Sequence, residues 1–308
     1  MNPLPPRAEI DLGTLEQFRS AWRLSFMRRL LRKLKEARSW MLSARNATDF
    51  PGALLLSICR TRPPSGPGFY SRCFRRLIPQ LSIHPRSLQG FSIAIHPSDM
   101  AELIIYEECF IRRVYDLALL PFKPDIVVDC GGFKGYFTLL AKARFPAATS
   151  VVFEPHPVNY GLMCSNFERN GVDVDARREA VSNRTGEMSF LGAGFGGSLT
   201  RSAAEEASIR VQVANLCDVI TGLSPRRLLL KLDVEGEEIN ILPDLVPLLP
   251  PTCGVFFESH HGNEGFEKLD VLLRRAGFVV TRGSIRDETF VDAFAIRVEA
   301  ETLLKSYA

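Results

Sequence analysis

The order of apolar and polar positions from about residue 90 onward predicts strands and helices in alternation. Short apolar runs typical of buried strands occur at DIVVDC, TSVVFEP, VDARREAV, LLLKLDV and GVFFES. Segments with helical spacing lie between or after them, at GYFTLLAKAR, VNYGLMCSNFERNG, EGEEINIL and FEKLDVLLRRAG. Strands that alternate with helices form a mainly parallel sheet, and continuous apolar runs fit strands covered on both faces. We therefore expect an α/β fold, doubly wound, with helices on both faces of one sheet.

Two further segments extend this pattern at its ends. Residues 92–96 alternate like a strand, and residues 98–119 predict a helix with Ser98 or Asp99 as its cap. At the other end, FVVTRG and FVDAFAIRV predict a closing pair of strands.

The N-terminal part follows a different pattern. Residues 14–40 predict one helix, because apolar side chains recur there at three- and four-residue steps and basic side chains fill much of the rest. Residues 1–80 hold 15 Lys and Arg against 5 Asp and Glu, although the whole chain carries a formal charge of only +3. Three readings of such a helix stay open. It binds an anionic membrane, it binds a nucleic acid or an acidic partner, or it packs on its own protein with the basic face in solvent.

The TRPPSGPG segment, residues 61–68, predicts a loop near the join between this part and the rest. We divide the chain into a basic, partly helical extension, residues 1–85, and a main domain, residues 86–308. Seven scattered cysteines without a C-x-x-C pair favour reduced thiols. With no apolar run of membrane-spanning length and no secretory layout, we expect a cytoplasmic protein, peripheral to the membrane if residues 14–40 bind lipid.

The segment VVDCGGFKGYFT, residues 127–138, carries the first candidate site. A buried strand ends at Asp129, and Gly131, Gly132 and Gly135 follow. Ligands of such sheets bind outside the carboxyl ends of the strands, and glycines let a ligand approach the backbone. The next helix offers free N–H groups to an anion. The alternative is a tight turn in which Asp129 caps the helix.

The frame of this turn bears on the kind of ligand. It reads D-x-G-G-x-x-G, and Cys130 stands where the dinucleotide fingerprint G-x-G-x-x-G has its first glycine. An acid before the glycines suits a ligand that carries an ammonium group as well as a carboxylate. S-adenosylmethionine carries both charges at its methionine end, whereas NAD has no ammonium group.

Two further positions fit a nucleoside. Glu154 ends the second strand of the main domain, nineteen residues after Gly135, where an acid accepts hydrogen bonds from ribose hydroxyls. Its alternative reading is a surface carboxylate before Pro155. The loop expected after the third strand, with Ala180 and Val181, is where an adenine ring would lie.

A second acidic cluster lies at the predicted fourth and fifth strands. In KLDVEGEE, the period of two places Lys231 and Asp233 on one face, so Asp233 points to the ligand edge and can take a proton from a hydroxyl. Glu235 either joins it or caps the next helix. In FFESHH, Glu258 and His260 are two apart. Asp233, Glu258 and His260 together would form a base, a substrate clamp or a magnesium site.

Four segments in this order resemble the FkbM-type S-adenosylmethionine-dependent methyltransferases: VVDCGGFKGYFT, VVFEPHPVNYGLMCSNFERNG, LLLKLDVEGEEINIL and FFESHHG. The resemblance covers about residues 90–300, and the K-x-D-x-E-G segment is its most specific part. The family usually has Ala-Asn after the first glycine, where this chain has Gly132 and Phe133. The resemblance implies a class I methyltransferase fold, which is Rossmann-like, and methyl transfer, typically to a hydroxyl oxygen of a sugar or other small molecule.

The resemblance also implies roles for particular residues. Asp129, Gly131 and Gly135 would hold the methionine end of the cofactor, and Glu154 its ribose. Asp233 and Glu235 would face the acceptor. The basic extension is not part of the family pattern.

Two alternatives stay open beside an O-methyltransferase acting on a small-molecule or glycan acceptor. One is an NAD-dependent oxidoreductase, against which Cys130 argues. The other is a non-catalytic scaffold associated with a membrane or, less in keeping with the sequence, a nucleic acid, for which the basic extension speaks. The oligomeric state and any need for magnesium are not readable from the sequence.

Overall fold

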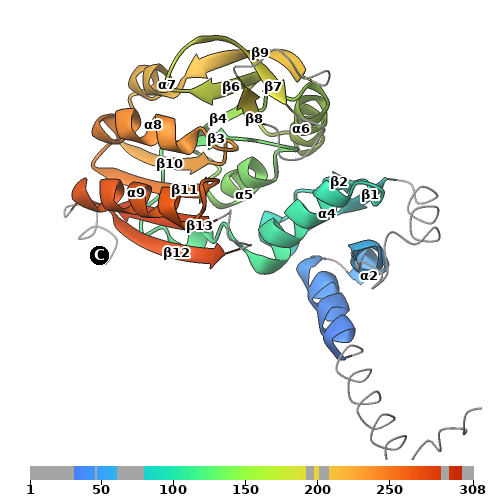
Figure 1. Ribbon diagram of the computed structural model, residues 1–308. Coiled ribbons are helices and arrows are strands. Elements are labelled where there is room, and N and C mark those ends of the chain that lie inside the picture. The colour runs from blue at the N-terminus through green and yellow to red at the C-terminus, as the bar shows by residue number, and fades with distance from the viewer. Residues whose placement is uncertain are drawn as a thin grey trace, which may run out of the picture.

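The computed structural model of the chain describes residues 31–45, 47–60, 80–191, 198–200, 208–285 and 291–299. At its centre is a seven-stranded sheet with the order β12-β13-β11-β10-β3-β4-β5 (Figure 1). Its strands are β3 (Ile126–Cys130), β4 (Thr149–Phe153), β5 (Asp175–Arg177), β10 (Arg227–Leu232), β11 (Thr252–Ser259), β12 (Val279–Ile285) and β13 (Val291–Arg297). Strands β5, β4, β3, β10 and β11 pair in parallel, and β13 is antiparallel to β11 and β12. The predicted mainly parallel sheet is confirmed.

Helices cover both faces of this sheet, as the continuous apolar strands predicted. One face carries α5 (Tyr136–Arg144) and α6 (Pro157–Asn170), and the other carries α7 (Leu216–Leu223), α8 (Glu238–Leu245) and α9 (Gly262–Arg275) (Figure 1). Successive strand residues point to opposite faces, so Val127 and Leu229 join the first core while Val128 and Leu230 join the second.

The strand order reverses between β3 and β10. The chain leaves β3 for β4 on one side and later returns to β10 on the other, and Asp129 lies directly opposite Lys231 in the pairing. The turns that follow β3 and β10 therefore lie side by side at one edge of the sheet. This is the switch point at which doubly wound sheets bind ligands.

A smaller four-stranded sheet holds β6 (Glu179–Ser182), β9 (Ser208–Asn215), β7 (Gly186–Leu191) and β8 (Ser198–Thr200), in that order. The single strand predicted at VDARREAV is thus divided between β5 and β6, which belong to different sheets. The Ala180 side chain packs with Phe190 and Val213 in a small core of this second sheet. The expectation that Ala180 and Val181 lie in a loop is therefore wrong.

The described N-terminal part consists of short elements packed beside α5. Residues 31–43 are helical, and α2 (Phe50–Arg60), β1 (Leu81–Ile83), β2 (Ile93–Ile95) and α4 (Met100–Tyr106) follow. Asp99 rather than Ser98 caps α4, and a π-helical stretch continues α4 to Arg112, short of the predicted end at 119. Residues 14–30 of the predicted basic helix lie outside the described residues. No helix among the described residues is long and apolar enough to cross a bilayer.

This part shares the core of the main domain. Trp40 is only 3% exposed and stacks on Tyr106, with ring centroids 5.0 Å apart. Ala53 and Leu56 are fully buried in the same cluster as α5. Strand β1 pairs with β2 across the predicted boundary at residue 85.

We expect Trp40→Ala to lower the free energy of unfolding of the whole domain by about 3–5 kcal/mol, because it empties a packed site against Tyr106. Urea unfolding followed by far-ultraviolet circular dichroism measures the change. Leu34→Ala on the same helix is the control, since Leu34 is 57% exposed. Equal effects of the two substitutions would show that the helix does not belong to the domain core.

Candidate active site

The glycine turn after β3 is held by the protein's own backbone. The N–H groups of Gly131 and Gly132 both donate to the carbonyl oxygen of Phe153, at 3.0 and 2.8 Å. The turn thereby closes onto the end of β4. Gly135 has a φ of +83°, which favours glycine, and it begins α5.

Close packing explains why these positions lack side chains. A Cβ atom on Gly131 would overlap the backbone carbonyl of Asp233. One on Gly132 would overlap Val152, and one on Gly135 would lie 2.6 Å from the Phe167 ring. The sequence suggests that ligand approach is the reason for these glycines. The structure shows that packing against β10, β4 and α6 already requires them.

Glu154 lies at the end of β4 beside this turn and is 6% exposed. Its Oε2 accepts from the N–H of Phe133 at 2.7 Å, and its Oε1 accepts from the N–H of His156 at 2.9 Å. Phe133 has a φ of +49°, an unusual value for a bulky residue. Burial raises the pKa of Glu154 to about 7, although both hydrogen bonds act to lower it. The alternative reading of Glu154 as a surface carboxylate is wrong.

Lys134 fixes the other side of the glycine turn. It is 2% exposed, and its Nζ donates to Asp99 and to Glu102, at 2.8 Å in each case. Glu102 is fully buried and also accepts from the Tyr136 hydroxyl at 2.8 Å and from the N–H of His96 at 2.9 Å. A buried charge is tolerated where it is paired and hydrogen-bonded. This network ties the turn to α4.

Lys231 links the ends of β3 and β10. Its Nζ donates to the carbonyl oxygen of Gly131 at 2.8 Å and lies 3.5 Å from Asp129 Oδ1 and 3.3 Å from Asp233 Oδ2. Burial lowers the pKa of Lys231, but the two carboxylates outweigh that effect and hold it above its usual value. Lys231 is therefore a buried cation that two acids share.

Asp129 is fully buried beneath the turn. Its Oδ2 accepts from the Thr138 hydroxyl at 2.7 Å, and its Oδ1 accepts no hydrogen bond from any described residue. Burial raises the pKa of Asp129 although the Lys231 charge opposes the rise. Asp129 does not cap α5. The first-turn N–H groups of this helix donate to no capping side chain among the described residues.

The turn after β10 brings several acids together. Glu235 has a φ of +56° and is followed by Gly236 at +109°. Glu238, which is fully buried, accepts from the N–H groups of Val234 and Gly236 at 2.9 and 3.0 Å. Glu238, not Glu235, therefore organises this turn, and Glu235 is left facing His260.

His260 pairs with three of these carboxylates. Its Nδ1 lies 3.0 Å from Glu238 Oε1, and its Nε2 lies 3.1 Å from Glu235 Oε2 and 3.9 Å from Asp233 Oδ1. Burial lowers the pKa of His260, but the hydrogen bonds with Glu235 and Glu238 raise it to about 11. His260 is accordingly an imidazolium cation that neutralises the cluster.

As a metal site, the predicted grouping of Asp233, Glu258 and His260 is wrong in one member. Ligand atoms of Asp233, Glu235 and His260 all lie within 4.8 Å of one another, and Glu258 is outside this group. The reason is that β11 ends at Ser259, so the period of two does not carry over to His260. Asp233, Glu235 and His260 form an ion-pair network, and the same three side chains also bring their ligand atoms close enough together to hold a metal ion.

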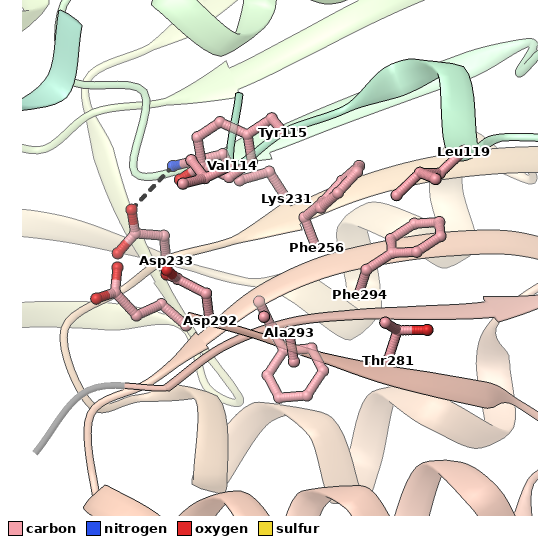
Figure 2. A pocket seen from close by; sticks show the side chains of 13 residues that line it. Val114, Tyr115, Leu119, Lys231, Asp233, Phe256, Thr281, Asp292, Ala293 and Phe294 are labelled. Carbon is pink, nitrogen blue, oxygen red and sulfur yellow. Dashed lines mark ion pairs between the residues drawn. The ribbon is translucent and has the colours of Figure 1, made fainter. Parts of the chain in front are cut away.

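Glu258 instead lines a cavity of about 110 Å³ next to Asp233. Figure 2 shows Asp233 and Asp292 at one end of this cavity and Phe256, Phe294 and Leu119 at the other. Tyr115 closes it from the segment after the π-helical stretch, with Lys231 Nζ 5.7 Å from its ring centroid.

The sequence did not single out Tyr115, Asp292, Glu102 or Glu238. Asp292 lies on β13, opposite Glu258 in the antiparallel pairing, and a strand pairing cannot be read from one segment. Glu238 was visible as the last acid of KLDVEGEE, and its position just after the turn residue Gly236 was the available signal. Tyr115 carries no motif.

Numbered by chain order within the sheet, the strands run 3-2-1-4-5-7-6 with the seventh antiparallel, and acids end the first, second and fourth. This arrangement is that of a class I methyltransferase. A family model described as the methyltransferase FkbM domain matches residues 129–280. The chain belongs to the FkbM family of methyltransferases, and its cofactor is S-adenosylmethionine, as the sequence predicted.

Three relatives are similar over much of their length. Methyltransferase 1 of Beauveria bassiana is 31% identical over 184 residues, covering 50% of this chain and 72% of its own. Methyltransferase sdnD of Sordaria araneosa is 29% identical, covering 62% of this chain and 87% of its own. Hexuronic acid methyltransferase AglP of Haloferax volcanii is 24% identical, covering 55% and 70%. An oxidoreductase is not supported by these findings.

The residues at the switch point fit this cofactor. Each oxygen of Glu154 accepts one hydrogen bond and retains a lone pair for a ribose hydroxyl. Asp129 and Asp233 share the single ammonium of Lys231, so the edge has an excess of negative charge for the cofactor's cationic groups. The open N-terminus of α5 suits the methionine carboxylate.

We expect the free energy of unfolding of Glu154→Gln, relative to that of the wild type, to increase with pH. The folded-state pKa of about 7 exceeds that of an unfolded Glu, so wild-type stability falls as pH rises from about 4.5 to 7. Between pH 4 and pH 8, the difference in unfolding free energy between the two proteins should shift by about 3 kcal/mol in favour of the variant. Urea unfolding at several pH values measures it, and a difference that stays constant contradicts the buried placement of Glu154.

We expect Lys231→Met to lower the free energy of unfolding by about 3–5 kcal/mol, because it leaves Asp129 buried without its cation. The double variant Lys231→Met, Asp129→Asn should lose less than Lys231→Met alone, since the orphaned charge is removed. Lys268→Met is the control, because Lys268 is exposed and should leave the urea midpoint unchanged. A loss no larger than that of the control would mean that Lys231 is not a buried cation.

Proposed function

We propose that the protein methylates a hydroxyl oxygen of a sugar or another small molecule. The observation that carries this proposal is the position of Asp233. Its carboxylate stands at the end of β10, beside the switch point, and it also lines the cavity next to that edge. Asp233 thus lies between the place for the cofactor and the place for an acceptor.

The chemistry at Asp233 suits an alcohol. Bound S-adenosylmethionine supplies a methyl group on a positively charged sulfur. A hydroxyl must lose its proton as its oxygen forms the new bond, and a carboxylate within hydrogen-bond reach orients the oxygen and accepts that proton. Lys231 and His260, 3.3 and 3.9 Å from Asp233, hold the carboxylate in place.

The other predicted residues take supporting roles in this proposal. His260 carries a proton already and so does not serve as the base; with Glu235 it positions Asp233. Glu154 accepts from the ribose, and the turn of Gly131, Gly132 and Gly135 shapes the methionine end together with Asp129. Ala180 and Val181 are buried in β6 and would offer an adenine ring only the neighbouring backbone.

The similarity to AglP, whose name describes a hexuronic acid methyltransferase, supports a sugar acceptor only weakly at 24% identity. The acceptor has to be found by incubating the protein with S-adenosylmethionine labelled in its methyl group and a metabolite extract. Mass spectrometry then identifies the labelled product.

We expect Asp233→Asn to lower the turnover number at least about a hundredfold, because the proton acceptor is lost. The affinity for S-adenosylhomocysteine, measured by calorimetry, should change little. Asp218→Asn is the matched control, since Asp218 lies exposed on α7, away from β10. Full activity of Asp233→Asn, or a label found on nitrogen or carbon, would overturn the proposal.

A further inference from the structure

The helix of residues 31–43, drawn in blue in Figure 1, has two different faces. Its inner face carries the buried Trp40, which stacks on Tyr106 of α4. Its outer face carries three leucines that are each more than half exposed: Leu31, Leu34 and Leu42. The inner face alone accounts for the packing of this helix on the domain, so the outer leucines call for another explanation.

Basic side chains lie between these leucines. Leu31, Lys35, Arg38 and Leu42 follow one another at steps of four, three and four residues, which places them along one stripe of the helix. Lys35 and Arg38 are both exposed. The only acid among residues 31–45 is Glu36, and its carboxylate lies 3.8 Å from the guanidinium of Arg32. The outer face thus combines apolar and cationic side chains.

The positive charge of this part of the chain follows from the sequence. Residues 1–30 and 61–79, which lie outside the described residues, hold nine arginines against three acids. The segments on either side of the described N-terminal elements therefore add positive charge. Over residues 1–80, 15 basic side chains stand against 5 acidic ones.

We propose that the outer face of the helix of residues 31–43 binds the surface of an anionic lipid bilayer. The leucines enter the boundary between headgroups and acyl chains, and the Lys and Arg side chains reach the anionic headgroups. Their long apolar stems lie along the same boundary while the charged ends stay in the polar layer. A nucleic acid would engage the basic side chains but leave the leucines in water. The leucines therefore favour lipid.

The helix presents this face already formed. The hydroxyl groups of Ser43 and Tyr106 are 2.9 Å apart and share a hydrogen bond, which adds to the stacking of Trp40. A surface held in its binding conformation does not have to be ordered on binding. Because Tyr106 belongs to α4, whose Glu102 holds the glycine turn through Lys134, a bilayer bound to this helix keeps the methyltransferase domain at its surface.

Sedimentation of the full chain with lipid vesicles tests the proposal. We expect vesicles of phosphatidylcholine and phosphatidylglycerol to bind at least about tenfold more tightly than vesicles of phosphatidylcholine alone, with affinity that falls as salt is raised. Leu34→Gln combined with Leu42→Gln should weaken binding to the anionic vesicles at least about tenfold, because two apolar side chains leave the boundary. Lys35→Gln combined with Arg38→Gln should weaken it at least about fivefold.

Matched substitutions elsewhere on the domain are the controls. Leu248→Gln replaces a leucine that is 47% exposed at the end of the short helix Val246–Leu248. Lys268→Gln combined with Arg275→Gln removes two exposed cations from α9. Both controls should leave the affinity for anionic vesicles unchanged. All the replaced side chains are exposed, so each variant should keep the urea midpoint of the wild type.

The proposal is overturned if the full chain does not bind anionic vesicles, if it binds neutral vesicles equally well, or if the control substitutions weaken binding as much as those on the helix. It is also overturned if the Lys and Arg variant loses affinity while the leucine variant does not. That result would indicate a purely electrostatic partner, such as a nucleic acid or an acidic protein. None of these measurements needs S-adenosylmethionine or a methyl acceptor, so their outcome is independent of the proposed function.

Discussion

The ammonium of Lys231 is the interaction on which the candidate site depends. It lies between Asp129 on β3 and Asp233 after β10, and it also binds the carbonyl oxygen of the glycine turn. The buried Asp129 and the partly exposed Asp233 would repel each other at this range, and one cation between them makes their proximity tolerable. The parallel pairing of β3 with β10 places Lys231 opposite Asp129, so the sheet register itself sets this geometry. Without the Lys231 cation, the turns after β3 and β10 could not pack against each other.

A second ion-pair network, centred on His260, likewise places one cation among several acids. Glu235, Glu238 and Asp233 surround His260, and the imidazolium neutralises them. Lys231 approaches Asp233 from β10, and His260 approaches it from the turn after β11. A carboxylate fixed in this manner keeps one orientation, which serves the alignment of an acceptor oxygen better than a freely rotating acid would. A positively charged methyl donor, for its part, needs little from a base.

Local sequence predicted the sheet well because each buried strand and its following turn are encoded in neighbouring residues. The run ending at Asp129 and the acid at Glu154 could be placed at the ligand edge from their positions alone. What could not be predicted depends on pairing between distant segments. Tyr115 and Asp292 line the cavity but come from segments that carry no motif. The expected third strand is divided, because residues of β6 pair and pack within the second sheet, where Ala180 joins a small core. His260 shows the limit of periodicity, since the strand ended one residue before it.

The matched family domain begins at Asp129, but the clamp on its glycine turn begins earlier in the chain. Asp99, just before α4, and Glu102, within α4, are the counter-ions of Lys134. A chimera that transplanted residues 129–280 alone would bury Lys134 with no anion to receive it. The upstream segment is thus part of the structure that holds the cofactor turn. Chimeras between members of this family have to include it if the turn is to be preserved.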